Sequence, residues 1–416
     1  MENYRSFDFL SKISFERLGG SEQELKAANM IIAECHKMGV EAHLEDFLVD
    51  GYSVKAASLE ANGVSYEVTG VGMSGSTPAD GVVGKLLVLE NDDQLNQYET
   101  LEDYVVFVSS RIGVKTYKTL CEKKALAFIC ASGSVYDDRD NSDLEKMTVR
   151  ERHYSNGKVP GVCVRMMDAQ KMLLDNPETV HVVCLQDEYK NTSHNVVASI
   201  PGDGSTNEIV CFTAHYDSVA FSTGAYDNGT GSTTILQSLA YFIEHKPKRN
   251  LKFIWCGSEE MGLLGAKAYC EAHADDLKNH KLCINVDMTG VVLGRDIACC
   301  TSKDSLVSYI NYMGKEVGFN ISAKQGVYSS DSTPFADKGV PSLSFARLAP
   351  RGGAEIHSRK DVIDFLDSEN YYKTCEFINM FADRMVNSKV FPVEQIIPDN
   401  MKNEIDIYFG RKERNQ

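Results

Sequence analysis

From residue 195 onward, short apolar runs alternate with segments that place apolar side chains at helical spacing. The runs predict strands that end at His215, at Cys256, at Val286 and near Phe345. The intervening residues 228–245 and 262–277 predict helices. Strands that alternate with helices are typical of a mostly parallel sheet with helices packed on it. The sequence therefore predicts an α/β fold.

The amino terminus predicts the opening of the same domain. Residues 21–39 have helical periodicity and begin with a capping box formed by Ser21 and Glu24. Residues 40–47 then alternate between apolar and polar side chains like a strand. We therefore expect the first residues to pack with those beyond residue 195.

The middle of the chain has a different texture, with short strands separated by turns and one predicted helix at about 114–124. It interrupts the α/β pattern on both sides. The predicted organisation is a discontinuous catalytic domain of residues 1–51 and 191–416, with a β-rich inserted domain at residues 52–190.

Charge and hydropathy exclude two classes of partner. The 416 residues include 59 acidic and 43 basic side chains, a net charge of −16. This excess of negative charge disfavours nucleic acids and anionic membrane surfaces as partners. No run is long and apolar enough to span a bilayer, and residues 1–10 lack the pattern of a secretory signal. We expect no nucleic acid partner, no membrane association and a cytoplasmic location.

Each predicted strand ends beside side chains that can bind a metal ion. In open α/β sheets, ligands bind at the carboxyl ends of the strands. The candidates are His215 and Asp217, Asp227 in the next turn, Glu259 and Glu260, Asp287, and His357 beyond the last predicted strand. Two imidazoles and several carboxylates are therefore expected at one edge of the sheet.

Carboxylates gathered in one place raise one another's pKa and resist ionisation unless cations are present. Two divalent ions carry four positive charges, and three ligand carboxylates carry three negative charges. The remaining charge of about +1 would be neutralised by a bridging hydroxide. Mixed nitrogen and oxygen donors suit zinc first. The sequence therefore predicts two Zn²⁺ per chain, with Co²⁺ or Mn²⁺ as substitutes.

The stretch GSEEMGLLG, residues 257–265, sets two glutamates side by side directly after an apolar run. In a two-metal hydrolase, one glutamate can bind metal while its neighbour takes a proton from the bridging water. The pair Glu259 and Glu260 therefore suggests two roles at the end of one strand.

The order of these motifs resembles that of the dinuclear-zinc exopeptidase family, which includes bacterial leucyl-type aminopeptidases, glutamate carboxypeptidase and the transferrin receptor. The motifs are His215-x-Asp217, Asp227-Asn-Gly, Ser258-Glu-Glu-x-Gly-Leu-Leu-Gly265, Asn285-x-Asp287, Ser330-Asp-Ser-Thr-Pro-Phe335 and His357-Ser-x-x-Asp361. Residues about 55–190 resemble the family's inserted protease-associated domain. The resemblance implies a three-layer fold with a mostly parallel mixed sheet flanked by helices.

The resemblance also implies a role for each candidate. Asp227 would bridge both metals, and the other metal ligands would be His215 and Asp287 at one site and Glu260 and His357 at the other. Glu259 would be the general base of a bridging-hydroxide mechanism that removes N-terminal residues from peptides. Asp217 would orient His215.

One role needs a residue that the motifs do not supply. Some relatives carry a tyrosine next to the last metal histidine, where this chain has Ile356. Tyr328, just before the late loop at Ser330, is the candidate for stabilising the oxyanion that develops in the reaction.

Three functions remain open at this stage. A zinc aminopeptidase leads, followed by a related dinuclear carboxypeptidase, dipeptidase or amidase. A receptor-like member without catalysis is disfavoured, because all five ligand candidates and the base are present. A peptide is the expected partner, and the sequence leaves open whether the chain forms a homo-oligomer.

Overall fold

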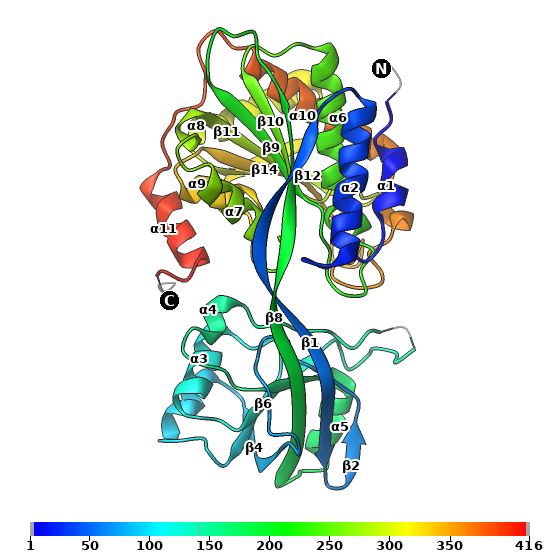
Figure 1. The fold of residues 1–416 in the computed structure, drawn as a ribbon, viewed down its shortest axis with the longest axis vertical. Helices are drawn as coiled ribbons and strands as arrows, with labels where there is room; N and C mark the ends of the chain where they lie inside the picture. Colours follow the sequence, from blue (N-terminus) through cyan, green and yellow to red (C-terminus); the bar gives the residue numbers. More distant parts are fainter. Residues whose placement is uncertain (1–3, 141, 413–416) are drawn as a thin grey trace. The chain divides into compact units, whose positions relative to one another are not determined.

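The computed structural model describes residues 4–140 and 142–412, which fall into two compact units. Unit 1 takes its residues from 1–49 and 192–416, and unit 2 from 50–191. The long strands β1 (Ala42–Ala61) and β8 (Thr179–Ile200) pair with each other and pass from one unit into the other (Figure 1). The strand predicted at 40–47 is therefore too short, because β1 continues through the turn-like pair Asp50-Gly51 while it pairs with β8.

The sheet of unit 1 has the strand order β13-β12-β14-β11-β9-β10-β8. Its strands beside β8 are β9 (Ile209–His215), β10 (Asn250–Cys256), β11 (His280–Val286), β12 (Arg295–Thr301), β13 (Ile321–Gln325) and β14 (Ser342–Leu348). The four central strands β14, β11, β9 and β10 run parallel, whereas β8 and β12 pair antiparallel with their neighbours. The predicted mostly parallel mixed sheet is confirmed.

Helices cover both faces of this sheet (Figure 1). On one face lie α1 (Phe7–Ile13), α2 (Glu22–Lys37), α6 (Thr230–Glu244), α8 (Asp304–Val317) and α10 (Ser368–Val386). On the other lie α7 (Leu264–Ala272) and α9 (Ser332–Asp337). The buried side chains of both faces, such as Phe212 and Cys211 on alternate positions of β9, form two separate cores. The predicted three-layer arrangement is confirmed.

The start of α2 realises only half of the predicted capping box. Ser21 Oγ accepts a hydrogen bond from Glu24 N at 3.1 Å, as predicted. The Glu24 carboxylate does not return to the Ser21 amide; it accepts from Gly20 N at 2.7 Å and turns into the protein interior. The helix keeps its cap, and the glutamate is left for contacts elsewhere.

The residues after α10 pack on unit 1. Val393 belongs to the core on the face covered by α6 and α10. α11 (Asp399–Tyr408) packs on α9 through Met401 and Ile405, together with Ile397 just before the helix. Along residues 4–140 and 142–412, no helix has both the length and the apolar character needed to cross a bilayer.

In unit 2 the hydrogen-bonded strand order continues from β8 as β8-β4-β5-β6-β7-β3. Its strands and helices are β2 (Val64–Tyr66), β3 (Val68–Gly70), β4 (Val82–Leu89), β5 (Tyr104–Val108), α3 (Val114–Glu122), β6 (Ala127–Ser132), α4 (Glu151–Tyr154), β7 (Gly161–Arg165) and α5 (Met166–Leu174). The helix predicted at 114–124 is present as α3. The sequence prediction missed α5, which begins directly after β7 without a turn and buries Ala169 and Met172 on the opposite face from α3.

One histidine of unit 2 makes the stability of this unit depend on pH. His153 is buried against Tyr117, and its Nδ1 accepts a hydrogen bond from Arg150 N at 3.2 Å. Burial, followed by the charge of Arg152, lowers its pKa to about 4. Between about pH 6.5 and pH 4 the unfolded chain binds a proton that the folded unit does not, so stability falls as the pH decreases through this window.

We therefore expect His153→Asn, which keeps an acceptor for Arg150 N, to weaken this pH dependence. Limited proteolysis in urea at pH 7 and pH 5, with fragments from residues 50–191 quantified by mass spectrometry, measures it. The matched variant His181→Asn should keep the wild-type difference between the two pH values. An unchanged difference in His153→Asn would contradict the assignment.

Candidate metal centre

Three central strands deliver polar side chains to the same edge of the sheet. β9 ends at His215, and its parallel neighbours β10 and β11 end at Cys256 and Val286, three residues before Glu259 and one residue before Asp287. Their registers align Cys256 with His215 and Asn285 with Thr213. Parallel strands with matched ends bring the residues that follow them to one place, as the sequence predicts.

Asp227 enters this place from the turn before α6. The side chain of Asn228 ties the turn to β11, since its Nδ2 donates to Val286 O at 2.9 Å and its Oδ1 accepts from Met288 N at 3.0 Å. At Gly231 a Cβ atom would lie 2.3 Å from Val286 O, so only glycine permits this close approach. The turn thus fixes Asp227 beside the ends of β9 and β11.

Two groups of candidate ligands form here, and they share Asp227. The donor atoms of His215, Asp227 and Asp287 lie within 4.8 Å of one another, and so do those of Asp227, Glu260 and His357. The structure therefore brings together all five residues that the sequence analysis proposed as metal ligands.

The two carboxylate oxygens of Asp227 face different histidines. Asp227 Oδ1 lies 3.1 Å from His215 Nε2, and Oδ2 lies 3.1 Å from His357 Nε2. The remaining members lie close by, with Asp287 Oδ1 3.7 Å from His215 Nε2 and Glu260 Oε1 3.0 Å from His357 Nε2. One oxygen for each histidine is the geometry of a carboxylate that bridges two cations.

These residues pass a test of fit to metal ions. Ligands about 2.1 Å from a tetrahedral Zn²⁺ lie about 3.4 Å from one another, close to the separations of the candidate donors. Asp287 Oδ1 is buried and accepts no hydrogen bond from the described residues. A buried carboxylate oxygen without a donor is costly unless a cation contacts it. The donor set therefore suits divalent cations such as zinc.

The pKa shifts of His357 and Asp227 show that the buried carboxylates of the site favour positive charge nearby. Burial lowers the pKa of His357, but the carboxylates of Asp227 and Glu260 outweigh burial and raise it to about 10. Burial raises the pKa of Asp227, and hydrogen bonds from the two histidines overcome it and hold this pKa below its usual range. The carboxylates thus favour positive charge at this edge of the sheet, which bound cations would supply.

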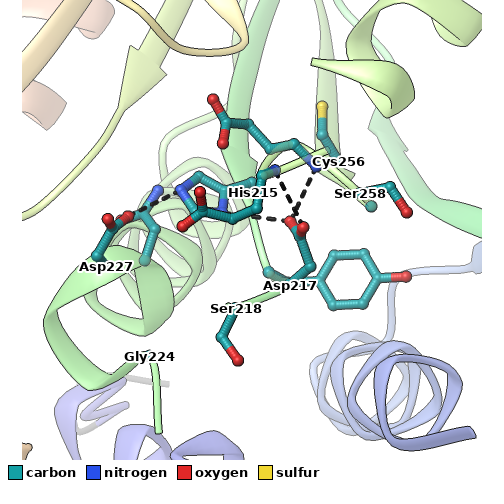
Figure 2. Close-up of polar contacts among 12 residues, drawn as sticks. His215, Asp217, Ser218, Gly224, Asp227, Cys256 and Ser258 are labelled. Atoms are coloured by element: carbon teal, nitrogen blue, oxygen red, sulfur yellow. Dashed lines mark hydrogen bonds and ion pairs between the residues drawn. The ribbon is translucent and has the colours of Figure 1, made fainter. Parts of the chain in front are cut away.

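Two further candidates lie beside the five candidate ligands. They are Asp217, proposed to orient His215, and Glu259, proposed as the general base. Asp217 is fully buried, and its Oδ1 lies 3.3 Å from His215 Nδ1, on the ring edge opposite the ligand candidates (Figure 2). Glu259 belongs to neither group of ligand candidates and is buried. Burial raises its pKa well above the ordinary range, with further contributions from Glu260 and Asp331.

Tyr328 lies close enough to the candidate ligands for their charges to affect its pKa. Burial, followed by the charges of Asp287 and Asp227, raises the pKa of its phenol. The hydroxyl therefore stays protonated and able to donate a hydrogen bond. Its backbone is fixed by Ser330 N and Thr333 Oγ1, which both donate to Tyr328 O.

Asp361 and Arg17 shape the Asp227 turn, although no role was predicted for them from the sequence. The Asp361 carboxylate accepts from Tyr226 N at 2.7 Å and from Asp227 N at 3.1 Å. Arg17 is fully buried and donates to the carbonyl oxygens of Tyr216, Thr223 and Gly224. The closeness of Asp361 to His357 in sequence was an available signal, whereas nothing near Arg17 indicated its position.

An α/β domain that gathers histidines and carboxylates at the carboxyl edge of its sheet has the arrangement of a metal-dependent hydrolase. Residues 195–382 match the model described as "Peptidase family M28", so this part of the chain is similar to the members of that family.

The chain is homologous to characterised peptidases. It is 26% identical to aminopeptidase YwaD of Bacillus subtilis over 94% of this chain and 85% of the relative. It is 26% identical to mouse carboxypeptidase Q over 65% of this chain and 61% of that protein. The solved structure of BSAP, a zinc aminopeptidase from Bacillus subtilis, superposes with a TM-score of 0.78 at 20% identity, covering 94% of this chain and 97% of that one.

Metal ions are expected to stabilise unit 1. Zn²⁺ at about 100 times its dissociation constant adds about 2.7 kcal/mol, which corresponds to a rise of roughly 5–10 °C in the unfolding temperature. Scanning calorimetry with Zn²⁺ or a chelator, together with metal analysis, measures this. His215→Ala should lose the rise, and the control His273→Ala, a histidine outside both groups, should keep it. An equal rise in both variants would place the metal elsewhere.

Proposed function

We propose that this chain is an aminopeptidase that binds two Zn²⁺ and removes N-terminal residues from peptides. Asp227 would bind both ions, and His215 with Asp287 and Glu260 with His357 would complete the two sites. The observation that carries the proposal is the pair of Asp227 oxygens, each 3.1 Å from a different histidine. Co²⁺ and Mn²⁺ are proposed substitutes, since the donors are imidazoles and carboxylates.

The family relatives support an aminopeptidase over the alternatives. The similarity to aminopeptidase YwaD runs along 94% of this chain, whereas that to carboxypeptidase Q covers 65%. The match to the zinc aminopeptidase structure covers 94% of the chain and so includes most of residues 50–191. This supports the proposal that unit 2 is the family's inserted protease-associated-type domain.

In the proposed mechanism His215, Asp227, Glu260, Asp287 and His357 would hold the cations, which would supply polarisation of the scissile carbonyl and a lower pKa of the attacking water. Glu259 accepts the proton of that water and delivers it to the leaving amine, a role open to it because it belongs to neither ligand group. Asp217 holds the ring of His215 through Nδ1. Tyr328 donates a hydrogen bond to the oxygen on which negative charge develops.

A pool of short peptides, half with free and half with acetylated amino termini, tests the activity. We expect the zinc-loaded protein to remove N-terminal residues stepwise from the free-amine peptides only, as followed by mass spectrometry. Glu259→Gln should lower kcat about 10²–10⁴-fold, because the general base is lost.

The matched control is Glu271→Gln, an exposed position on α7, which should behave like the wild type. A ladder from the carboxyl terminus would favour the carboxypeptidase alternative. No cleavage of any peptide by protein that holds two metals would favour an amidase or a member without catalysis.

Tyr328→Phe tests the oxyanion role separately. Removing one such donor costs about 2.7–4 kcal/mol, so kcat should fall about 10²–10³-fold. KM should change little, because the hydrogen bond forms only as charge develops. Steady-state kinetics with Tyr312→Phe, an exposed tyrosine on α8, as the control measures this, and an unchanged kcat would remove Tyr328 from the mechanism.

A further inference from the structure

In the turn that carries the glutamate pair, the backbone carbonyls accept from amides of residues 262–265, whereas the backbone amides donate to side chains. Each of the four consecutive amides of residues 257–260 donates to a side-chain oxygen. The acceptors are Asn195 Oδ1 for Gly257 at 3.2 Å, Glu24 Oε1 for Ser258 at 2.8 Å, and the Asp217 oxygens for Glu259 and Glu260 at 3.0 and 3.1 Å. We call residues 257–260 the glutamate turn.

Two carboxylates therefore hold three successive amides of the glutamate turn. Asp217 was expected from the motif His215-x-Asp217 and lies beside the His215 ring (Figure 2). Glu24 comes from the first turn of α2, 234 residues before Ser258 in the chain. The second carboxylate thus reaches the glutamate turn from a distant segment of the sequence.

Glu24 is built into this place and is not a surface residue that happens to reach it. Its side chain is fully buried. Besides Ser258 N, its oxygens accept from Gly20 N at 2.7 Å and from Ser193 Oγ at 2.9 Å. The hydroxyl of Ser258 lies 2.8 Å from that of Ser193, which closes the cluster.

Glu24 and Ser193 pack closely against Gly257. At Gly257 a Cβ atom would lie 2.9 Å from Glu24 Oε1 and 2.7 Å from Ser193 Oγ. The absence of a side chain at Gly257 is what allows the carboxylate to approach the glutamate turn.

The glutamate turn needs this external support. Ser258 has a φ angle of 51°, in the left-handed region that residues with a Cβ seldom adopt. Such a conformation persists only where surrounding contacts hold it. The bond from Ser258 N to Glu24 supplies a contact at the strained residue itself, immediately before Glu259 and Glu260.

We propose that Glu24 is a positioning residue of the reaction: its carboxylate holds Ser258 in the left-handed conformation and thereby aims Glu259 at the water and Glu260 at the metal. The effect on catalysis rests on the proposed aminopeptidase function. Glu24 does not contact the reacting atoms and acts only through the glutamate turn.

Two substitutions weaken the contact between Glu24 and Ser258 N to different degrees. Glu24→Met has a similar length and removes both acceptors, whereas Glu24→Gln retains one. Loss of an outer partner of a metal site reduces activity or metal affinity about 10–100-fold, so we expect kcat of the folded, metal-loaded Glu24→Met enzyme to fall by this factor. KM should stay within about twofold, and Glu24→Gln should be intermediate.

Two further measurements do not depend on activity. Hydrogen exchange of a peptide that contains residues 257–260 should be faster in Glu24→Met than in the wild type, with unchanged exchange in β9 and β11. Titration with Co²⁺, followed by its absorption spectrum, should show weaker binding, because the turn that positions Glu260 loses its contact at Ser258. Glu34→Met, a change on the same helix away from the glutamate turn, is the matched control for all three measurements.

The outcomes separate this inference from the proposed function. If Glu24→Met and Glu24→Gln are less stable but keep wild-type kcat, exchange and Co²⁺ affinity, Glu24 is only structural and the inference is wrong. If Glu24→Met does not fold, Glu24→Gln decides by the same criteria. If the wild type cleaves no peptide, the proposed function fails, and exchange together with Co²⁺ affinity still decides the role of Glu24.

Discussion

Mutual repulsion among buried carboxylates is the constraint on which the structure of unit 1 depends. Asp217, Asp227, Glu259, Asp287 and Asp331 are all buried around the carboxyl edge of the sheet. The fully buried guanidinium of Arg17 supplies positive charge there, and the imidazoles of His215 and His357 each lie against one Asp227 oxygen. Backbone amides supply the rest of the stabilisation. Asp361 accepts two of them at the Asp227 turn, and Asp217 and Glu24 accept three at the glutamate turn.

Much of the fold and the ligand set followed from local patterns in the sequence. Apolar runs that end at His215, Cys256 and Val286 are complete strands, and their parallel alignment places the next residues together without further information. The residue types near the strand ends indicated a wider set of candidates. The resemblance of their order to that of the dinuclear-zinc exopeptidases then selected the proposed ligands, which are His215, Asp227, Glu260, Asp287 and His357. The structure gathers these five, while the part that each plays in binding and catalysis remains a proposal.

What the sequence did not indicate depends on contacts between distant segments. Glu24 matched a local capping box, and its actual partners Ser193 and Ser258 lie 169 and 234 residues away. Arg17 binds carbonyl oxygens, which every residue possesses, so its sequence neighbourhood carries no trace of them. The extension of β1 through Asp50-Gly51 likewise reflects its pairing with β8 rather than any preference of its own residues.

The way β1 and β8 connect the two units bears on the order in which the chain folds. Residues 50–191 are contiguous, so unit 2 can fold while later residues are still being synthesised, whereas α2 must wait for β9 and β10. Closing a loop of 169 residues between Glu24 and Ser193 carries an entropic penalty that grows with the free length of the loop. Once unit 2 has folded and β1 has paired with β8, that free length shrinks to the residues between Glu24 and the start of β1, because Ser193 lies within β8. The folded insertion therefore lowers the entropic cost of packing the amino-terminal segment on the rest of unit 1.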